Sequence, residues 1–103
     1  MIRQRQAKII ATLGPSTSNI EMIERLFLEG ADIFRLNFSH GTHELHEKNY
    51  NNIREIEKKY NTPIGILMDL QGPKLRIGIF ENDKVTLSPE QQFKLDLDNT
   101  PGN

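Results

Sequence analysis

The segment from Phe34 to Gly41 places three polar side chains at alternating positions in an otherwise apolar run. Because strand side chains alternate between two faces, Arg35, Asn37 and Ser39 share one face of the predicted strand. Burying a guanidinium and two hydrogen-bonding groups without partners costs several kcal/mol, so this face requires partners or a ligand. No acidic residue shares it with Arg35, whose planar donors suit phosphate or carboxylate. The segment therefore predicts an anion-binding site.

Apolar segments that alternate with helical patterns must position these residues. We predict, in chain order, a strand at 8–13, a helix at 18–30, a strand at 33–38, a helix at 42–60 and a strand at 64–68. Strands that alternate with helices are typical of right-handed βαβ units and a parallel sheet. The sequence thus predicts an α/β fold.

Local signals define the helix ends and the covered faces. Ser18 and Glu21 have the spacing of a capping box, and Gly30 offers a C-terminal cap to the same helix. Residues 64–68 form a continuous apolar run, as expected of a strand covered on both faces. The second helix should bury one stripe, formed by Leu45, Asn49, Ile53, Ile56 and Tyr60.

Polar residues at the strand ends should meet at one edge of the sheet. Parallel α/β folds bind ligands at the carboxyl ends of the strands, where Asn37, Ser39 and Asp69 fall. Their hard oxygen atoms carry a single negative charge, which suits a weakly held cation and is poor for zinc or iron. Alternatively, Asn37 and Ser39 only cap the next helix, and Asp69 only caps a turn.

Two histidines lie near the start of the second predicted helix. His43 and His46 are three residues apart and could mimic a pair of metal ligands, but no third ligand follows them. We therefore expect both on a solvated helix face.

The carboxyl-terminal part has a different pattern. Residues 74–80, 84–87 and 92–97 alternate without a helical period, which predicts the start of an antiparallel β unit after a boundary near Pro73. Three parallel strands cannot close a barrel, so we expect the chain to continue or to associate with a partner.

Composition excludes several classes of protein. The 103 residues are 36% hydrophobic and 26% charged, with a net charge of -1, which gives no global field for nucleic acid or an anionic membrane. No cysteine is present, so disulfides, thiolate metal sites and a cysteine nucleophile are excluded. The amino-terminal apolar run is too short for a secretory signal, and a cytoplasmic location is expected.

Residues 8–16, 34–41 and 68–76 resemble the pyruvate kinase family in the order and spacing of their motifs. The resemblance covers nearly all of this chain, but only the amino-terminal part of such an enzyme. It implies that residues 1–73 form the first three βα units of a TIM (β/α)8 barrel. Residues 74–103 would then begin an inserted, small antiparallel β-barrel domain.

The resemblance also implies roles for single residues. Arg35 would contact the phosphate of phosphoenolpyruvate. Nucleotide would be bound by Asn37, His40 and Arg76. Potassium would be held by Asn37, Ser39, Asp69 and the backbone carbonyl of Leu70, a position where many members have Thr. Two alternatives stay open: His40 could simply cap a helix, and Arg76 could be an exposed residue on an antiparallel strand.

Lys74 departs from the pattern, because potassium-dependent members of the family carry Glu at this position. A lysine ammonium is a compact charge on a flexible stem and could replace the positive charge of potassium. We therefore expect little or no potassium requirement. The alternative is a solvated surface lysine.

The implied activity is phosphoryl transfer from phosphoenolpyruvate to ADP with Mg²⁺, which gives pyruvate and ATP in the last step of glycolysis. In the family, the catalytic lysine and the Mg²⁺ ligands lie beyond Asn103, so the 103-residue chain alone is expected to be inactive. Family members are commonly homotetramers. Two alternatives remain: a non-catalytic α/β chain that binds an anion or a partner, and another barrel enzyme acting on phosphoenolpyruvate or pyruvate.

Overall fold

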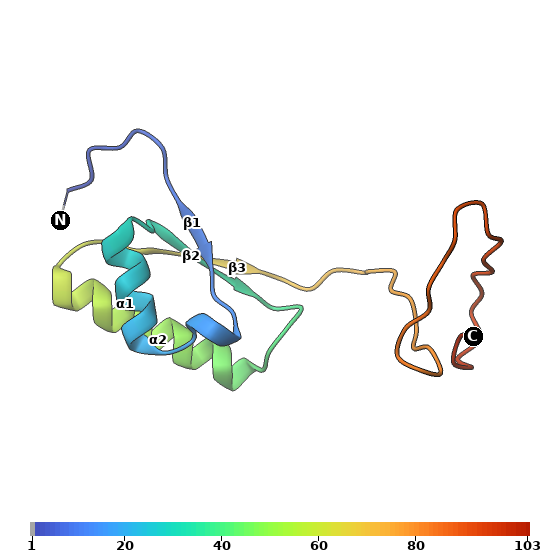
Figure 1. Ribbon diagram of the computed structural model, residues 1–103. Coiled ribbons are helices and arrows are strands. Elements are labelled where there is room, and N and C mark those ends of the chain that lie inside the picture. Colours follow the sequence, from blue (N-terminus) through green and yellow to red (C-terminus); the bar gives the residue numbers. More distant parts are fainter. Residues whose placement is uncertain (1) are drawn as a thin grey trace. The chain divides into compact units, whose positions relative to one another are not determined.

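The structure, a computed structural model, describes residues 2–103 and divides into two compact units that meet in sequence at Gly72 and Pro73. The first unit contains a three-stranded parallel sheet in the order β1-β2-β3, and Figure 1 shows both helices against one face of it. Its elements are β1 (Ile10–Thr12), the 3-10 turn η1 (Pro15–Thr17), α1 (Ile20–Glu29), β2 (Ile33–Asn37), α2 (His43–Tyr60) and β3 (Gly65–Asp69). The predicted α/β fold with a parallel sheet is confirmed.

The core lies between the helices and the covered face of the sheet. Phe34 and Leu36 of β2 are buried there, while Arg35 and Asn37 alternate with them and are only partly buried. Burial of each large apolar side chain contributes roughly 1.5–3 kcal/mol. The helices complete the core with Ile23, Phe27, Ile53 and Ile56. β2 is therefore anchored by one face and presents its polar residues on the other.

Strand β3 differs from the prediction of a strand covered on both faces. Leu67 and Met68 are 39% and 57% exposed, and only Ile66 packs against the core. β3 is an edge of the described sheet, and the helices cover a single face. A continuous apolar run corresponds to a fully buried strand only where other elements pack against both faces of the sheet.

The start of α1 also differs from the prediction. Its N-cap is Asn19, whose side-chain oxygen accepts a hydrogen bond from the backbone N–H of Met22 at 2.8 Å. Ser18 instead belongs to the end of η1, and its hydroxyl donates to the carbonyl of Pro15 at 3.4 Å. The 3-10 turn occupies the residues before the helix and delays its start. Gly30 caps the other end as predicted, with φ of 129°.

The second unit has no regular strand in residues 73–103, so the antiparallel strands predicted at 74–80, 84–87 and 92–97 are wrong for this structure. Its one β contact is an isolated parallel bridge between Phe80 and Gly102. Alternating apolar side chains are exposed throughout it, at Leu75, Ile77, Ile79, Leu95 and Leu97. An alternating pattern forms a strand only when a neighbouring strand pairs with its backbone. No helix in residues 2–103 has the length and apolar character needed to cross a bilayer.

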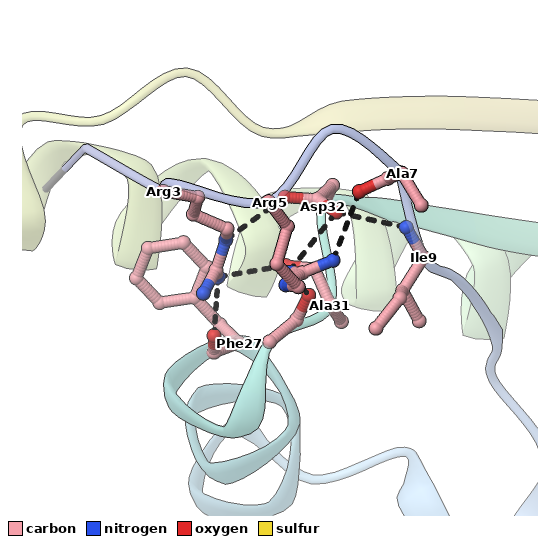
Figure 2. Close-up of polar contacts among 8 residues, drawn as sticks. Arg3, Arg5, Ala7, Ile9, Phe27, Ala31 and Asp32 are labelled. Carbon is pink, nitrogen blue, oxygen red and sulfur yellow. Dashed lines mark hydrogen bonds and ion pairs between the residues drawn. The ribbon is translucent and has the colours of Figure 1, made fainter.

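The amino-terminal segment is fastened to the turn between α1 and β2 (Figure 2). The Asp32 carboxylate accepts bonds from Arg3 Nε at 2.8 Å, Arg5 Nη2 at 3.3 Å and the backbone N–H of Ile9 at 2.8 Å. The two arginines also donate to carbonyls at the end of α1, including that of Ala31 at 3.0 Å. Cations are favourable at a helix C-terminus, so this cluster both caps α1 and holds the approach to β1 beside β2.

We predict that Asp32→Asn lowers the Tm of the purified protein by a few degrees, because the charge that holds Arg3 and Arg5 is lost. The pKa of Asp32 is lowered mainly by the Ile9 N–H bond and also by the two arginines, which shows that the fold favours the ionised carboxylate. Glu55→Gln, at an exposed position in α2, is the matched control. Equal Tm values for the two variants would contradict this role.

The two helices are joined by a second polar cluster. The Glu24 carboxylate of α1 accepts bonds from Lys59 Nζ and from the Tyr60 hydroxyl of α2, each at 2.5 Å. These two bonds hold the pKa of Glu24 below its ordinary value of 4.5. Since the folded form resists protonation, the stabilisation is present above the unfolded pKa and is lost as the pH falls through the folded one.

We therefore predict that wild type is more stable than Glu24→Gln at about pH 6, and that this advantage shrinks below about pH 4.5. Thermal melts of both proteins across this range measure the difference. A difference that stays constant down to about pH 3 would show that Glu24 does not act through its charge.

Candidate functional site at the strand ends

Arg35 is surrounded by residues of all three strands. Its Nε donates to Asp69 Oδ2 at 3.0 Å, its Nη2 bonds to the same oxygen, and its Nη1 donates to Thr12 Oγ1 at 3.4 Å. The side chains of Arg35 and Asp69 are 31% and 46% exposed, so the pair is open to solvent on one side. An ion pair this exposed contributes about 0–1 kcal/mol to folding. Its main effect is to orient the guanidinium.

The register of the sheet explains this contact. Thr12 is the β1 partner of Arg35, but the β3 partner of Arg35 is Leu67, and Asp69 is aligned with Asn37. The guanidinium therefore reaches two residues further along β3, toward the carboxyl end of the sheet. No acidic residue lies on the Arg35 face of β2, as the sequence indicates, and the folded sheet supplies one from β3, Asp69.

The paired guanidinium keeps some of its donors. Arginine has five N–H groups, and the contacts to Asp69 and Thr12 use three of them. Both bonds to Asp69 end on Oδ2. The remaining donors and the exposure of Arg35 let it bind an anionic oxygen while Asp69 still holds the group in place.

The residues after β2 form a tight rim loop, which we define as residues 37–42. Asn37 Oδ1 accepts the backbone N–H of Ser39 at 3.0 Å, and the N–H of His40 donates to the carbonyl of Asn37 at 3.2 Å. The N-cap of α2 is Thr42, whose side chain accepts the N–H of Leu45. Asn37 thus turns the loop, and the alternative in which Asn37 and Ser39 cap α2 is not what the structure has.

The donor set at the rim fits a weakly held cation in chemistry. Asn37 and Asp69 are aligned on adjacent strands, and both carry oxygen ligands beside the loop that holds Ser39. One carboxylate among neutral oxygens suits a monovalent ion better than zinc or iron. Within residues 2–103, no group of three or more His, Asp or Glu side chains is placed to hold a metal ion.

His46 is the residue that sequence reasoning placed wrongly. It is 8% exposed rather than solvated, its Nε2 lies 2.7 Å from the carbonyl of His40, and its ring stacks on Phe38 at 4.3 Å. Leu45, expected in the buried stripe, is exposed instead. A buried helical stripe continues at a spacing of either three or four residues. Counting back three residues from Asn49 gives His46, which is buried, whereas counting back four gives Leu45, the residue predicted above.

The other predicted site residues are exposed. His40 lies in the rim loop, and Leu70 follows β3 with 68% of its surface exposed. Lys74 and Arg76 belong to the second unit, where both are exposed. The structure thus brings together Arg35, Asn37, Ser39 and Asp69, and roles for Lys74, Arg76 and the Leu70 carbonyl stay predictions.

The chain is similar to known proteins over nearly all of its length. Residues 4–103 match the family model described as pyruvate kinase, barrel domain. A pyruvate kinase of Methylorubrum extorquens is 52% identical over 103 residues, which are 100% of this chain and 22% of that protein. One from Agrobacterium vitis is 46% identical over 95% of this chain and 21% of its own length. The chain therefore spans about a fifth of the curated relatives it matches.

A solved structure gives the same result. The crystal structure of Cryptosporidium parvum pyruvate kinase superposes with a TM-score of 0.69 at 45% identity, over 79% of this chain and 17% of that one. Similarity of this extent covers both the sequence and the βα arrangement. The chain belongs to the pyruvate kinase family.

Proposed function

We propose that this chain acts as part of a pyruvate kinase, which transfers the phosphoryl group of phosphoenolpyruvate to ADP and yields pyruvate and ATP. The observation that carries the proposal is the Arg35 guanidinium, held by Asp69 and Thr12 at the carboxyl ends of parallel strands with N–H donors to spare. Ligands of barrel enzymes bind at that end of the sheet.

The physical problem of this reaction is the negative charge of two anionic substrates. Cationic groups that are placed before the reaction lower the barrier, because no reorganisation is needed as charge moves. Arg35 would bind the phosphate of phosphoenolpyruvate with the donors that Asp69 and Thr12 leave unused. Asp69 keeps the guanidinium in one orientation at the ends of the strands.

The rim would also bind nucleotide and a monovalent cation. We assign the nucleotide to Asn37, His40 and Arg76. We assign the cation to Asn37, Ser39, Asp69 and the carbonyl of Leu70, with Lys74 as a substitute for K⁺. A bound monovalent ion would supply positive charge beside the transferring phosphate.

Other parts of the activity belong outside this chain. The catalytic lysine and the Mg²⁺ ligands of the family fall after Asn103. The activity is therefore proposed for the full-length protein, as a cytoplasmic homotetramer whose barrel is closed by later βα units.

We predict that the full-length protein forms pyruvate from phosphoenolpyruvate and ADP, and that Arg35→Lys loses roughly 100-fold in kcat/KM for phosphoenolpyruvate. Lysine keeps the charge but cannot contact Asp69 and a phosphate with a planar fork of donors. A coupled assay of pyruvate formation measures the effect.

Arg25→Lys, at an exposed position in α1, is the matched control and should retain full activity. Equal rates for Arg35→Lys and wild type would exclude Arg35 from the phosphate site. An inactive wild-type enzyme would instead favour the non-catalytic alternative.

Lys74, which stands where potassium-dependent members of the family carry Glu, predicts how the enzyme responds to potassium. At constant ionic strength, we expect the full-length wild type to be activated little by K⁺, because the lysine ammonium already supplies a positive charge. Lys74→Glu should lower the activity without K⁺ and create activation by it. Lys84→Glu makes the same charge change at another exposed site of the second unit and serves as the control. Strong activation of wild type by K⁺ would refute the role of Lys74.

A further inference from the structure

One buried side chain contacts the rim loop on both sides of Ser39. The His46 ring stacks on Phe38 with a centroid distance of 4.3 Å and an interplanar angle of 25°, and its Nε2 lies 2.7 Å from the carbonyl of His40. Phe38 and His40 are the two chain neighbours of Ser39. A single residue on the first turns of α2 therefore holds the peptide segments before and after a predicted cation ligand.

The direction of the hydrogen bond between His46 and His40 follows from the two groups that form it. A backbone carbonyl only accepts hydrogen bonds, so Nε2 carries the proton and donates it. The other ring nitrogen, Nδ1, is buried and has no hydrogen-bond partner among the described residues. His46 is therefore a fixed donor aimed at the rim loop.

The loop lies close to helix α2 at Gly41. Gly41 has a φ of 74°, and a Cβ there would lie 3.2 Å from Leu45 Cδ2 and 3.4 Å from His46 Nε2. The positive φ and the close contact both favour glycine. The backbone is thus turned against His46, and the His40 carbonyl is directed at the imidazole.

We propose that His46 is a positioning residue for nucleotide binding: it holds the rim loop so that Asn37, Ser39 and His40 keep their orientation. The inference rests on the proposed function. His46 touches no substrate in this scheme, since it is buried beneath Phe38 and His40. It acts through the two peptide segments that flank Ser39.

The loop and Arg35 are held by different contacts, which makes the proposal selective. Arg35 lies within β2 and is oriented by the side chains of Asp69 and Thr12. The loop is held at its start by the bond from the Phe38 N–H to the Asp69 carbonyl, and beyond it by the Asn37 turn and His46. Loss of the His46 donor should therefore disturb nucleotide binding more than phosphoenolpyruvate binding. A residue needed only for stability would affect both substrates equally.

The test compares three variants of the full-length enzyme. His46→Phe keeps an aromatic ring against Phe38 but removes the donor, and we expect its KM for ADP to rise about 10-fold with little change in KM for phosphoenolpyruvate. His46→Gln restores an N–H near the position of Nε2 and should recover most of the loss. Lys48→Gln introduces the same side chain two residues later in α2, at an exposed position, and should match wild type.

Backbone amide exchange provides a readout that does not require activity. In His46→Phe, the amides of Ser39 and His40 should exchange faster, while β2 stays protected. If the wild-type enzyme proves inactive, the proposed function fails and this measurement alone decides the role of His46. Unchanged exchange in the loop, or equal rises of KM for both substrates, would overturn the positioning role.

Discussion

The parallel pairing of β2 with both of its neighbours is the constraint on which the site depends. Alternation along β2 sends Phe34 and Leu36 into the core and leaves Arg35 and Asn37 on the other face. The same pairing aligns Thr12 with Arg35 and Asp69 with Asn37. A shift of one residue would reverse every side chain of β2, bury a guanidinium and expose a phenyl ring. Core packing and site geometry are therefore set by one register.

The candidate site has two parts: Arg35 within strand β2, and the rim loop that follows this strand. Arg35 sits within a strand that is paired on both sides, and its ion pair adds orientation more than stability. The β2–β3 ladder holds the rim loop only at its start, where the Phe38 N–H donates to the Asp69 carbonyl at 2.9 Å. Beyond that point its shape comes from the Asn37 turn, the Gly41 backbone and the buried His46 ring. Groups that are held in place before a ligand binds need no reorganisation, so the contacts behind the loop contribute to any site built on it.

Polar clusters away from the site stabilise the same layer of helices and strands. Asp32 ties the amino-terminal segment to the end of α1, and Glu24 joins α1 to α2. Both bond to partners far along the chain, so they connect elements that local hydrogen bonds leave separate. The sequence did not predict either cluster, because arginine, lysine and acidic residues are also typical of an ordinary solvent-exposed surface.

The sequence by itself determined the order and approximate extent of the helices and strands of the first unit, the parallel sheet and the family. Periodicity, Gly30 and the three motifs are local properties, and they can be read without knowing the partners. The tertiary structure alone decided that Asp69 pairs with Arg35, that His46 is buried while Leu45 is not, and that residues 73–103 form no regular strand. Each of these outcomes depends on which other segment of the chain packs against the residue. Strand register and burial are properties of two segments in contact, so neither segment's sequence determines them alone.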